Sequence, residues 1–228
     1  MKAIATSFPK PQTLMDFLVD SYNTGGSVSL LALSGLFHLI QTKNLDYPNF
    51  YPKLYALLDR DIFFVRYRSS FFRLLDVFLA STHLPAALVA SFIKRMARLS
   101  LSAPPAAIVT VIPLVYNLLK RHPTCTFMLH REGTPQDRAQ WLAHGMKDPF
   151  NPSEPDPMKT GAAESCLWEL DTLTGHWHPN VATLASILGQ QFTKERYTME
   201  DFLDHSYASV GPRPSLFSIY AGPLTVRI

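Results

Sequence analysis

The stretch PAALVASFIKRMARL, residues 85–99, shows how this chain is built. Leu88, Phe92, Met96 and Leu99 fall within about 80° of one another when each residue advances by about 100°. An apolar stripe at that period, opened by a proline, is typical of an amphipathic helix with one face against a core. We expect Lys94 and Arg98 to point away from the core, with Arg95 laying its stem over the apolar edge.

Similar segments lie on both sides of this stretch. Before it, the pattern predicts helices over residues 27–44, 48–58 and 65–80, and after it over residues 104–121, followed by a short helix from Pro123. Successive amphipathic helices with brief connections pack as antiparallel pairs. We therefore predict an all-α fold, specifically a HEAT- or armadillo-like α-solenoid of antiparallel helix pairs.

Residues 106–119 are almost wholly apolar. This run is shorter than the roughly 20 residues that a membrane span needs, and Pro113 and Asn117 interrupt it. We expect a buried central helix here. A hydropathy scan could flag this run, or residues 28–40, but we expect no membrane span.

The composition changes after Arg131. Residues 132–160 are rich in Pro, Asp, Glu and Gly, and the string DPFNPSEPDP at 148–157 cannot be helical, because proline lacks an amide donor and fixes φ. We predict a long acidic loop that is mobile alone and ordered by a partner, with Phe150 and Trp168 as apolar anchors at its edges. Helices are expected to resume over residues 161–173 and 179–191, with a last short one from Thr198.

These patterns divide the chain into five segments. They are a flexible start at 1–11, a helical-repeat region with basic faces at 12–131, the acidic Pro-rich loop at 132–160, carboxy-terminal helices at 161–210, and an atypical tail at 211–228.

The net charge of +3 conceals two oppositely charged halves. Residues 53–131 hold eleven Lys or Arg and three acidic residues, whereas residues 132–204 hold five Lys or Arg and twelve acidic residues. Either the halves attract each other within the fold, or the charged faces bind partners. The sequence leaves both alternatives open.

No residue pattern indicates catalysis or a metal site. Cys125 and Cys166 do not form a Cys-x-x-Cys motif, which disfavours a zinc site or a disulfide framework and fits a reducing compartment. His176 and His178 could offer imidazoles to a metal, but we favour a packed Trp177 between two surface histidines. We expect no enzyme activity, no cofactor and no metal.

Asp201, Asp204 and His205 have the residue types for acid and base chemistry, but no nucleophile accompanies them. A capping and solvating role is the better interpretation.

The basic helix faces are the candidate partner-binding site. Arg66 and Arg73 are seven residues apart and share a face of their helix, and Lys94, Arg95 and Arg98 lie on the next one. Such faces could bind acidic protein segments or phosphates, or could simply be solvated. No aromatic residues alternate with them for base stacking. The candidate contacts are Arg66, Arg73, Lys94, Arg95, Arg98, Phe150 and Trp168.

Several strings resemble a known family. SLLALSGLF at 29–37, NLDYPNFY at 44–51, FFRLLDVFL at 71–79, HLP at 83–85, FIKRMARL at 92–99 and APP at 103–105 are similar to the CCAAT-binding-factor domain of the nucleolar complex family. SCLWEL at 165–170, HP at 178–179 and DFLDHSY at 201–207 narrow the resemblance to one member, of which this chain is expected to be the carboxy-terminal portion. The resemblance covers roughly residues 12–210.

This resemblance implies a non-enzymatic assembly factor of the small-subunit processome in the nucleolus, required for 18S rRNA processing and maturation of the 40S precursor. It also implies pairing with nucleolar protein 14. The alternative function is an RNA-binding module of the pre-ribosome that uses the basic helix faces. The family name suggests CCAAT-box binding, but no segment forms a base-reading helix, so we do not expect that activity.

Overall fold

The computed structural model describes residues 11–43, 49–129, 141–145, 148–190, 192–193 and 195–203. Within these ranges every regular element is a helix and no strand occurs, so the predicted all-α class is confirmed. Residues 1–10, the loop residues 130–140 and 146–147, and everything from 204 onward, including the expected tail at 211–228, lie outside the described residues.

Helices of moderate length form the first half, and shorter elements form the second. The α-helices are α2 (Pro11–Tyr22), α3 (Gly26–Lys43), α4 (Phe50–Leu57), α5 (Arg68–Phe78), α6 (Ala86–Ser100), α7 (Pro105–Arg121), α9 (Trp168–Thr172), α10 (Pro179–Leu188) and α11 (Glu200–Leu203). The 3₁₀ helices are η1 (Asp61–Phe63), η2 (Pro123–Met128), η3 (Ala162–Glu164) and η4 (Leu173–Gly175).

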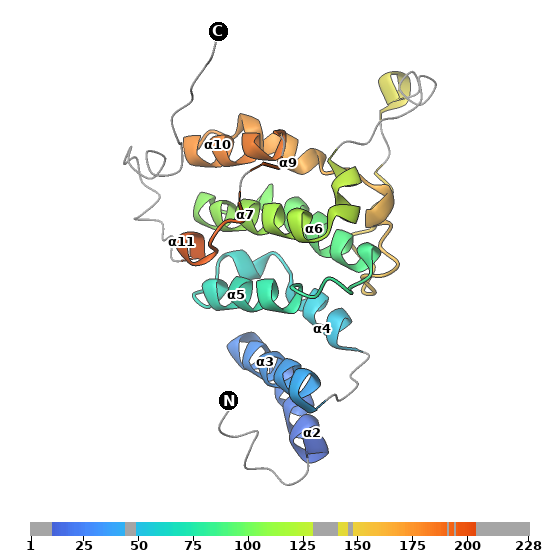
Figure 1. Cartoon of the computed structure of the whole chain (residues 1–228), viewed down its shortest axis with the longest axis vertical. Helices are drawn as coiled ribbons and strands as arrows, with labels where there is room; N and C mark the ends of the chain where they lie inside the picture. The colour runs from blue at the N-terminus through green and yellow to red at the C-terminus, as the bar shows by residue number, and fades with distance from the viewer. Residues whose placement is uncertain are drawn as a thin grey trace.

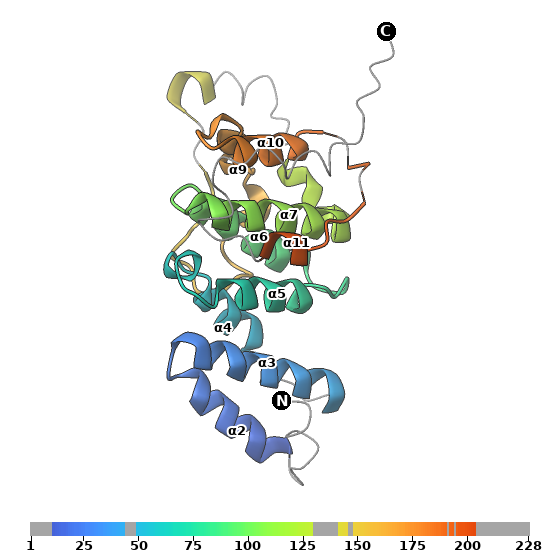
Figure 2. The same ribbon diagram turned by 90° about the vertical axis from the view of Figure 1, so that its left-hand side faces the viewer.

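The helices follow one another along the long axis of the molecule (Figure 1). The pair α2 and α3 forms one end, α5 and then α6 with α7 form the middle, and α9 with α10 lie at the other end (Figures 1 and 2). The order is broken by α11, which returns to pack against α5 and α7.

The central helix is α7, which contacts α6 on one side and α10 on the other. Every residue from Ala106 to Leu119 is buried, as the apolar run predicts. Pro104 stands at the N-cap and Pro105 in the first turn, where a missing amide costs no helical hydrogen bond. Among the described residues, no helix combines the length and apolarity needed to cross a membrane.

The helix predicted over residues 161–173 is wrong in its extent. Only η3 and the five-residue α9 form there, because Ser165 is extended and the Leu167 amide donates to the Met128 carbonyl at 2.9 Å rather than to a helical partner. This bond ties the start of α9 to the end of η2. It places the second half of the chain directly against the first.

Candidate binding site

The expectation that Lys94 points away from the core is wrong. Its side chain has no exposed surface, because α6 is covered on two sides, by α7 and by the segment from residue 148 to α9. The apolar stripe through Leu88, Phe92 and Met96 is buried as predicted. A second stripe of α6, containing Ser91 and Lys94, is buried as well.

Lys94 is enclosed by acceptors from the acidic half. Its Nζ lies 2.7 Å from Glu169 Oε1 and 3.0 Å from Asp148 Oδ2, and it donates to the Cys166 carbonyl at 2.6 Å. The Glu169 side chain is also fully buried. A buried ammonium needs this degree of pairing, since an unpaired charge in the interior costs several kcal/mol.

Arg98 completes a balanced group of two cations and two anions. Its Nη2 lies 2.5 Å from Asp148 Oδ2, and its Nε lies 2.9 Å from Glu169 Oε1. The Trp168 ring covers both cations, with its centroid 4.8 Å from Arg98 Cζ and 5.5 Å from Lys94 Nζ. We call Lys94, Arg98, Asp148 and Glu169 the Lys94 cluster.

The two carboxylates of the cluster differ in acidity. Burial by itself would raise the pKa of Asp148, but hydrogen bonds outweigh it and lower the pKa to about 2. The donors are the Ser165 hydroxyl, the Phe150 amide, Lys94 and the Trp168 indole. Burial raises the pKa of Glu169, and the Lys94 ammonium opposes that shift. Asp148 is therefore the firmly ionised partner of both cations.

Residues 148–160 form a closed loop against α6. The Asn151 amide donates to the Thr160 carbonyl at 2.8 Å, and the Ser91 hydroxyl contacts the Thr160 hydroxyl at 2.6 Å. Gly161 has φ of 72°, and a Cβ there would lie 2.7 Å from the Pro149 carbonyl oxygen, so only glycine fits.

The irregular backbone predicted over residues 132–160 is confirmed at 148–160, whereas residues 141–144 form a short helix instead. Its expected mobility is wrong for residues 148–160, because Phe150 and Thr160 are buried and the Lys94 cluster holds the loop.

The remaining basic candidates occupy separate places. Arg73 on α5 pairs with Glu200 on α11 through two contacts of 2.7 and 2.6 Å. Arg95 donates to the Leu58 carbonyl at 2.6 Å, and its guanidinium carbon lies 4.3 Å from the centroid of the Tyr55 ring. Arg66 is exposed and precedes α5, so the predicted shared face with Arg73 on one helix does not form. The candidates do not make one continuous basic surface.

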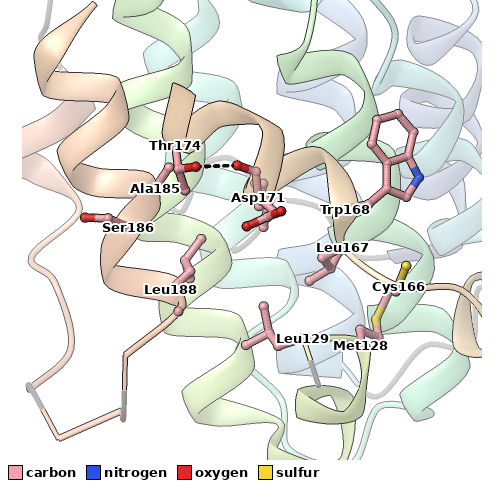
Figure 3. Close-up of a pocket in the computed structure, with 12 residues that line it drawn as sticks. Met128, Leu129, Cys166, Leu167, Trp168, Asp171, Thr174, Ala185, Ser186 and Leu188 are labelled. Atoms are coloured by element: carbon pink, nitrogen blue, oxygen red, sulfur yellow. Dashed lines mark hydrogen bonds between the residues drawn. The ribbon is translucent and has the colours of Figure 1, made fainter. Parts of the chain in front are cut away.

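A pocket of about 560 Å³ opens between α9, η4 and α10, next to the cluster (Figure 3). We call it the α9–α10 pocket. Half of its lining residues are apolar side chains from three elements: Met128, Leu129, Leu167, Leu170, Ala185 and Leu188. In Figure 3 the side chains of Leu129 and Leu188 point into the space beneath Asp171.

The polar residues of the α9–α10 pocket lie toward solvent. Asp171, Thr174 and Ser186 line it and are exposed. Cys166 lines it with partial exposure, while Cys125 is buried; both are free thiols. Trp168 turns away from the centre of the pocket toward the cluster, so the same short helix forms the wall of both features (Figure 3).

The prediction of a packed Trp177 between two surface histidines is wrong. Trp177 is 78% exposed, whereas His178 is buried, and the His178 amide donates to His176 Nδ1 at 3.0 Å. Burial lowers the pKa of His176.

Within the described residues, no three His, Cys, Asp or Glu side chains converge in a way that would hold a metal ion. Asp201 belongs to α11, and Asp204 and His205 lie outside the described residues.

The partners of Lys94 and the α9–α10 pocket were not identified from sequence. Asp148 lies 54 positions and Glu169 75 positions beyond Lys94, so no local spacing relates them. The only signal was the charge difference between the halves. The structure favours attraction within the fold, since Arg73, Lys94 and Arg98 all pair with acidic residues of the second half.

Comparison with known proteins identifies the family. Residues 29–185 match the CBF/Mak21 family, which is more than half of the chain. The chain belongs to the CBF/Mak21 family. The matched region contains α6, α7, the Lys94 cluster and most of the α9–α10 pocket.

The similar proteins are close in sequence. Nucleolar complex protein 4 of Saccharomyces cerevisiae is 53% identical over 224 residues, covering 92% of this chain and 41% of the relative. The nucleolar complex protein 4 homologue of Mus musculus is 48% identical over 202 residues, covering 89% of this chain and 38% of the relative. A Schizosaccharomyces pombe protein is 58% identical over 209 residues. The chain spans about 40% of the length of these relatives. The resemblance to the nucleolar complex family that the sequence motifs indicated is confirmed.

Proposed function

We propose that this chain is a non-catalytic helical scaffold that acts in the nucleolus during assembly of the small ribosomal subunit and processing of 18S rRNA. The observation that carries the proposal is its 53% identity, over 92% of its length, to a protein named nucleolar complex protein 4. The helices, stacked along one axis, are compatible with a HEAT- or armadillo-like solenoid, an architecture that commonly serves binding.

The proposed partner is a nucleolar protein, nucleolar protein 14 in the first instance. Arg66 and Arg73 remain proposed contacts, because both side chains reach solvent. For Lys94, Arg98, Phe150 and Trp168 we propose an indirect role, in which they hold the loop and α9 in place. The alternative as an RNA-binding module has less support, because acidic residues of the chain already neutralise three of the five basic candidates.

A segment exchange in Saccharomyces cerevisiae tests the assembly function. This chain replaces the matching segment of nucleolar complex protein 4, and the native protein is then depleted. We expect growth and normal 18S rRNA with the exchanged segment, and loss of both with an empty vector. Accumulation of unprocessed precursor in the exchange strain would contradict the proposal.

A binding assay separates protein binding from RNA binding. The purified chain is mixed with purified nucleolar protein 14 after nuclease treatment, over a range of salt concentrations. We expect binding that survives nuclease. Binding that requires RNA and falls steeply with salt would favour the RNA-binding alternative instead.

A further inference from the structure

The pair α2 and α3 forms the end of the molecule opposite α9 and α10 (Figure 2). Phe17 is 64% exposed on α2, and Val28 and Leu31 are 47% and 58% exposed on α3. A stack of helical pairs that ends in water normally ends in a pair with a polar outer face. Large apolar side chains gathered on such an end are evidence of a surface that another molecule covers.

Val28 and Leu31 lie on the side of α3 that faces away from the rest of the molecule. Phe37 marks the opposite side, because its ring centroid is 4.6 Å from that of Phe78 on α5. At 3.6 residues per turn, Leu31 lies about 120° and Val28 about 180° around the helix from Phe37. Both exposed side chains therefore belong to the outer surface of α3, one turn apart.

Phe17 has the same orientation on α2. Tyr22 marks the side of α2 that faces α4, because its hydroxyl donates to the Lys53 carbonyl at 3.1 Å. Phe17 lies about 140° around the helix from Tyr22. It is five residues before the end of α2, and Leu31 is five residues after the start of α3, so the two are level in the antiparallel pair. Phe17, Val28 and Leu31 thus form one surface, which we call the α2–α3 patch.

The border of the α2–α3 patch is acidic. Asp16 and Asp20 are exposed on α2, one before and one a turn after Phe17. Neither carboxylate takes part in an ion pair among the described residues. Residues 11–42 contain no Lys or Arg. An apolar surface beside unpaired carboxylates is complementary to apolar side chains flanked by Lys or Arg.

The lysines around the helix pair do not neutralise this border. Lys53 lies over the Tyr22 ring, on the side of α2 that faces α4. Lys43 is the last residue of α3, twelve residues from Leu31 and so about 18 Å along the helix. Lys10 lies outside the described residues.

We propose that the α2–α3 patch binds an amphipathic helix of a protein partner, whose apolar stripe packs on Phe17 and Leu31 and whose Lys or Arg pairs with Asp20. A helix suits this surface, because the side chains of two neighbouring helices form ridges and grooves into which a third helix packs. The 12 residues of α2 extend over about 18 Å, which about three turns of a partner helix would span. The proposal rests on the scaffold function and deepens it, since it names the chemistry of the bound segment.

The probe is a synthetic helical peptide with Leu on one face and Lys on the other. One control peptide carries Glu in place of every Lys, and a second has the same residues in an order that forms no stripe. The chain has a net charge of +3, so overall charge does not attract a cationic peptide. By fluorescence anisotropy with the full chain, we expect the Lys peptide to bind at least about tenfold more tightly than either control. Equal binding of the Lys peptide and either control would contradict the proposal.

Two matched pairs of variants locate the bound peptide. Phe17→Ser and Phe64→Ser each remove a Phe that is more than half exposed, but only Phe17 belongs to the patch. Asp20→Lys and Asp171→Lys make the same charge change at exposed positions, but only Asp20 borders the patch. We expect the dissociation constant to rise at least about tenfold in Phe17→Ser and Asp20→Lys, and to change less than about twofold in the two controls. Equal effects within either pair would overturn the proposal.

A second copy of the chain is the competing occupant of the patch. Sedimentation of the purified chain, at the concentrations of the peptide assay, should show a monomer. A dimer that Phe17→Ser dissociates would overturn the proposal, because the patch would then bind another copy of the chain.

The exchange strain separates this proposal from the assembly function. Phe17→Ser combined with Asp20→Lys in the exchanged segment should slow growth and reduce 18S rRNA, whereas Phe64→Ser combined with Asp171→Lys should not. If the first combination has no effect, the patch proposal fails and the assembly function stands. If the unmodified exchange already fails but the peptide assay gives the expected result, the assembly function fails and the patch proposal stands.

Discussion

Lys94 and Glu169 form an ion pair in which both side chains are completely enclosed. The attraction between the two charges in such a pair does no more than offset their loss of hydration, so the pair adds little stability of its own. Removing one partner is different, because the other charge stays buried with one counter-ion fewer. The cluster therefore makes the position of α9 and the 148–160 loop specific rather than strongly favourable.

Lys94→Met should lower the free energy of unfolding by about 3 to 5 kcal/mol, because it leaves Glu169 buried with only Arg98 as a cationic partner. Urea denaturation measures the change. The double variant Lys94→Met with Glu169→Leu should recover part of the loss, since no buried charge is left over from that pair. Arg66→Met, at an exposed position, serves as the control and should change stability by less than about 0.5 kcal/mol. If the double variant is no more stable than Lys94→Met alone, the stability is lost through side-chain packing and not through an unpaired charge.

Asp148 should make the protein sensitive to acid within a defined range. Its pKa is about 2 in the folded chain and about 3.9 when unfolded, so its contribution is complete above about pH 4 and is lost as the pH falls toward 2. The loss should be on the order of 2 kcal/mol. Glu169 has the opposite effect on stability, because its pKa is raised in the folded chain. Its ionisation destabilises the fold as the pH rises above about 4.3, which is outside this range.

Urea unfolding of the native chain and of Asp148→Asn between about pH 4 and pH 2 isolates this effect. The native chain should lose more stability over that range than the variant. Parallel pH profiles would exclude Asp148 as the acid-sensitive group.

At the scale of elements, sequence periodicity located most of the helices. The stripe Leu88, Phe92 and Met96 gave α6, and prolines at 85 and 104 marked the starts of α6 and α7, because the apolar period and the proline geometry are local properties. The same reasoning misplaced Lys94. A polar stripe indicates solvent only when nothing else covers it, and here a segment more than 50 positions later in the chain does so.

The site was predictable only in part, for the same reason. Phe150 and Trp168 were recognised as anchors, and both lie at the Lys94 cluster, with Lys94 Nζ 6.0 Å from the Phe150 ring centroid. Asp148 and Glu169 were not recognised, since surface and buried carboxylates look alike in sequence. The α9–α10 pocket depends on how three short elements meet, which no local pattern encodes.

The return of α11 depends on α7. Asn117 is buried, donates to the Tyr197 carbonyl at 2.8 Å and accepts from the Tyr197 amide at 2.8 Å. Asn117→Ala should cost about 1 to 3 kcal/mol, because both backbone groups lose their partner. Amide hydrogen exchange should rise most at Tyr197, whose amide loses its acceptor, and should also rise at Phe202 and Leu203 as α11 loosens.

The matched control for this element is Glu200→Ala. It breaks only the exposed ion pair with Arg73, so its effect on stability should be small and should become smaller as the salt concentration rises. If exchange at Phe202 and Leu203 is the same in Asn117→Ala as in the native chain, α11 is held by its other contacts, which include hydrogen bonds from Thr110 and Ser69 to the Phe202 and Leu203 carbonyls.

At the scale of the whole molecule, the two halves share one core. A single cluster of buried apolar side chains extends from Leu14 on α2 to Leu203 on α11. Oppositely charged residues of the two halves also pair across α6 and α5. The halves divided by charge are therefore not separate folding units, and we expect them to unfold together.

The chain carries its own probes for this expectation. All three tryptophans, Trp141, Trp168 and Trp177, lie in the second half, whereas the long helices α3, α5, α6 and α7 lie in the first. Fluorescence thus reports mainly on the surroundings of Trp141 and Trp168, which are partly buried, because Trp177 is already exposed. Far-ultraviolet circular dichroism reports mainly on the first half. In urea the two signals should change at the same midpoint, since coincident transitions are the mark of one cooperative unit. Lys94→Met should lower both midpoints equally, because it weakens the contact that joins the halves. A fluorescence midpoint below that of circular dichroism would show that the acidic half detaches first from a basic half that stays folded.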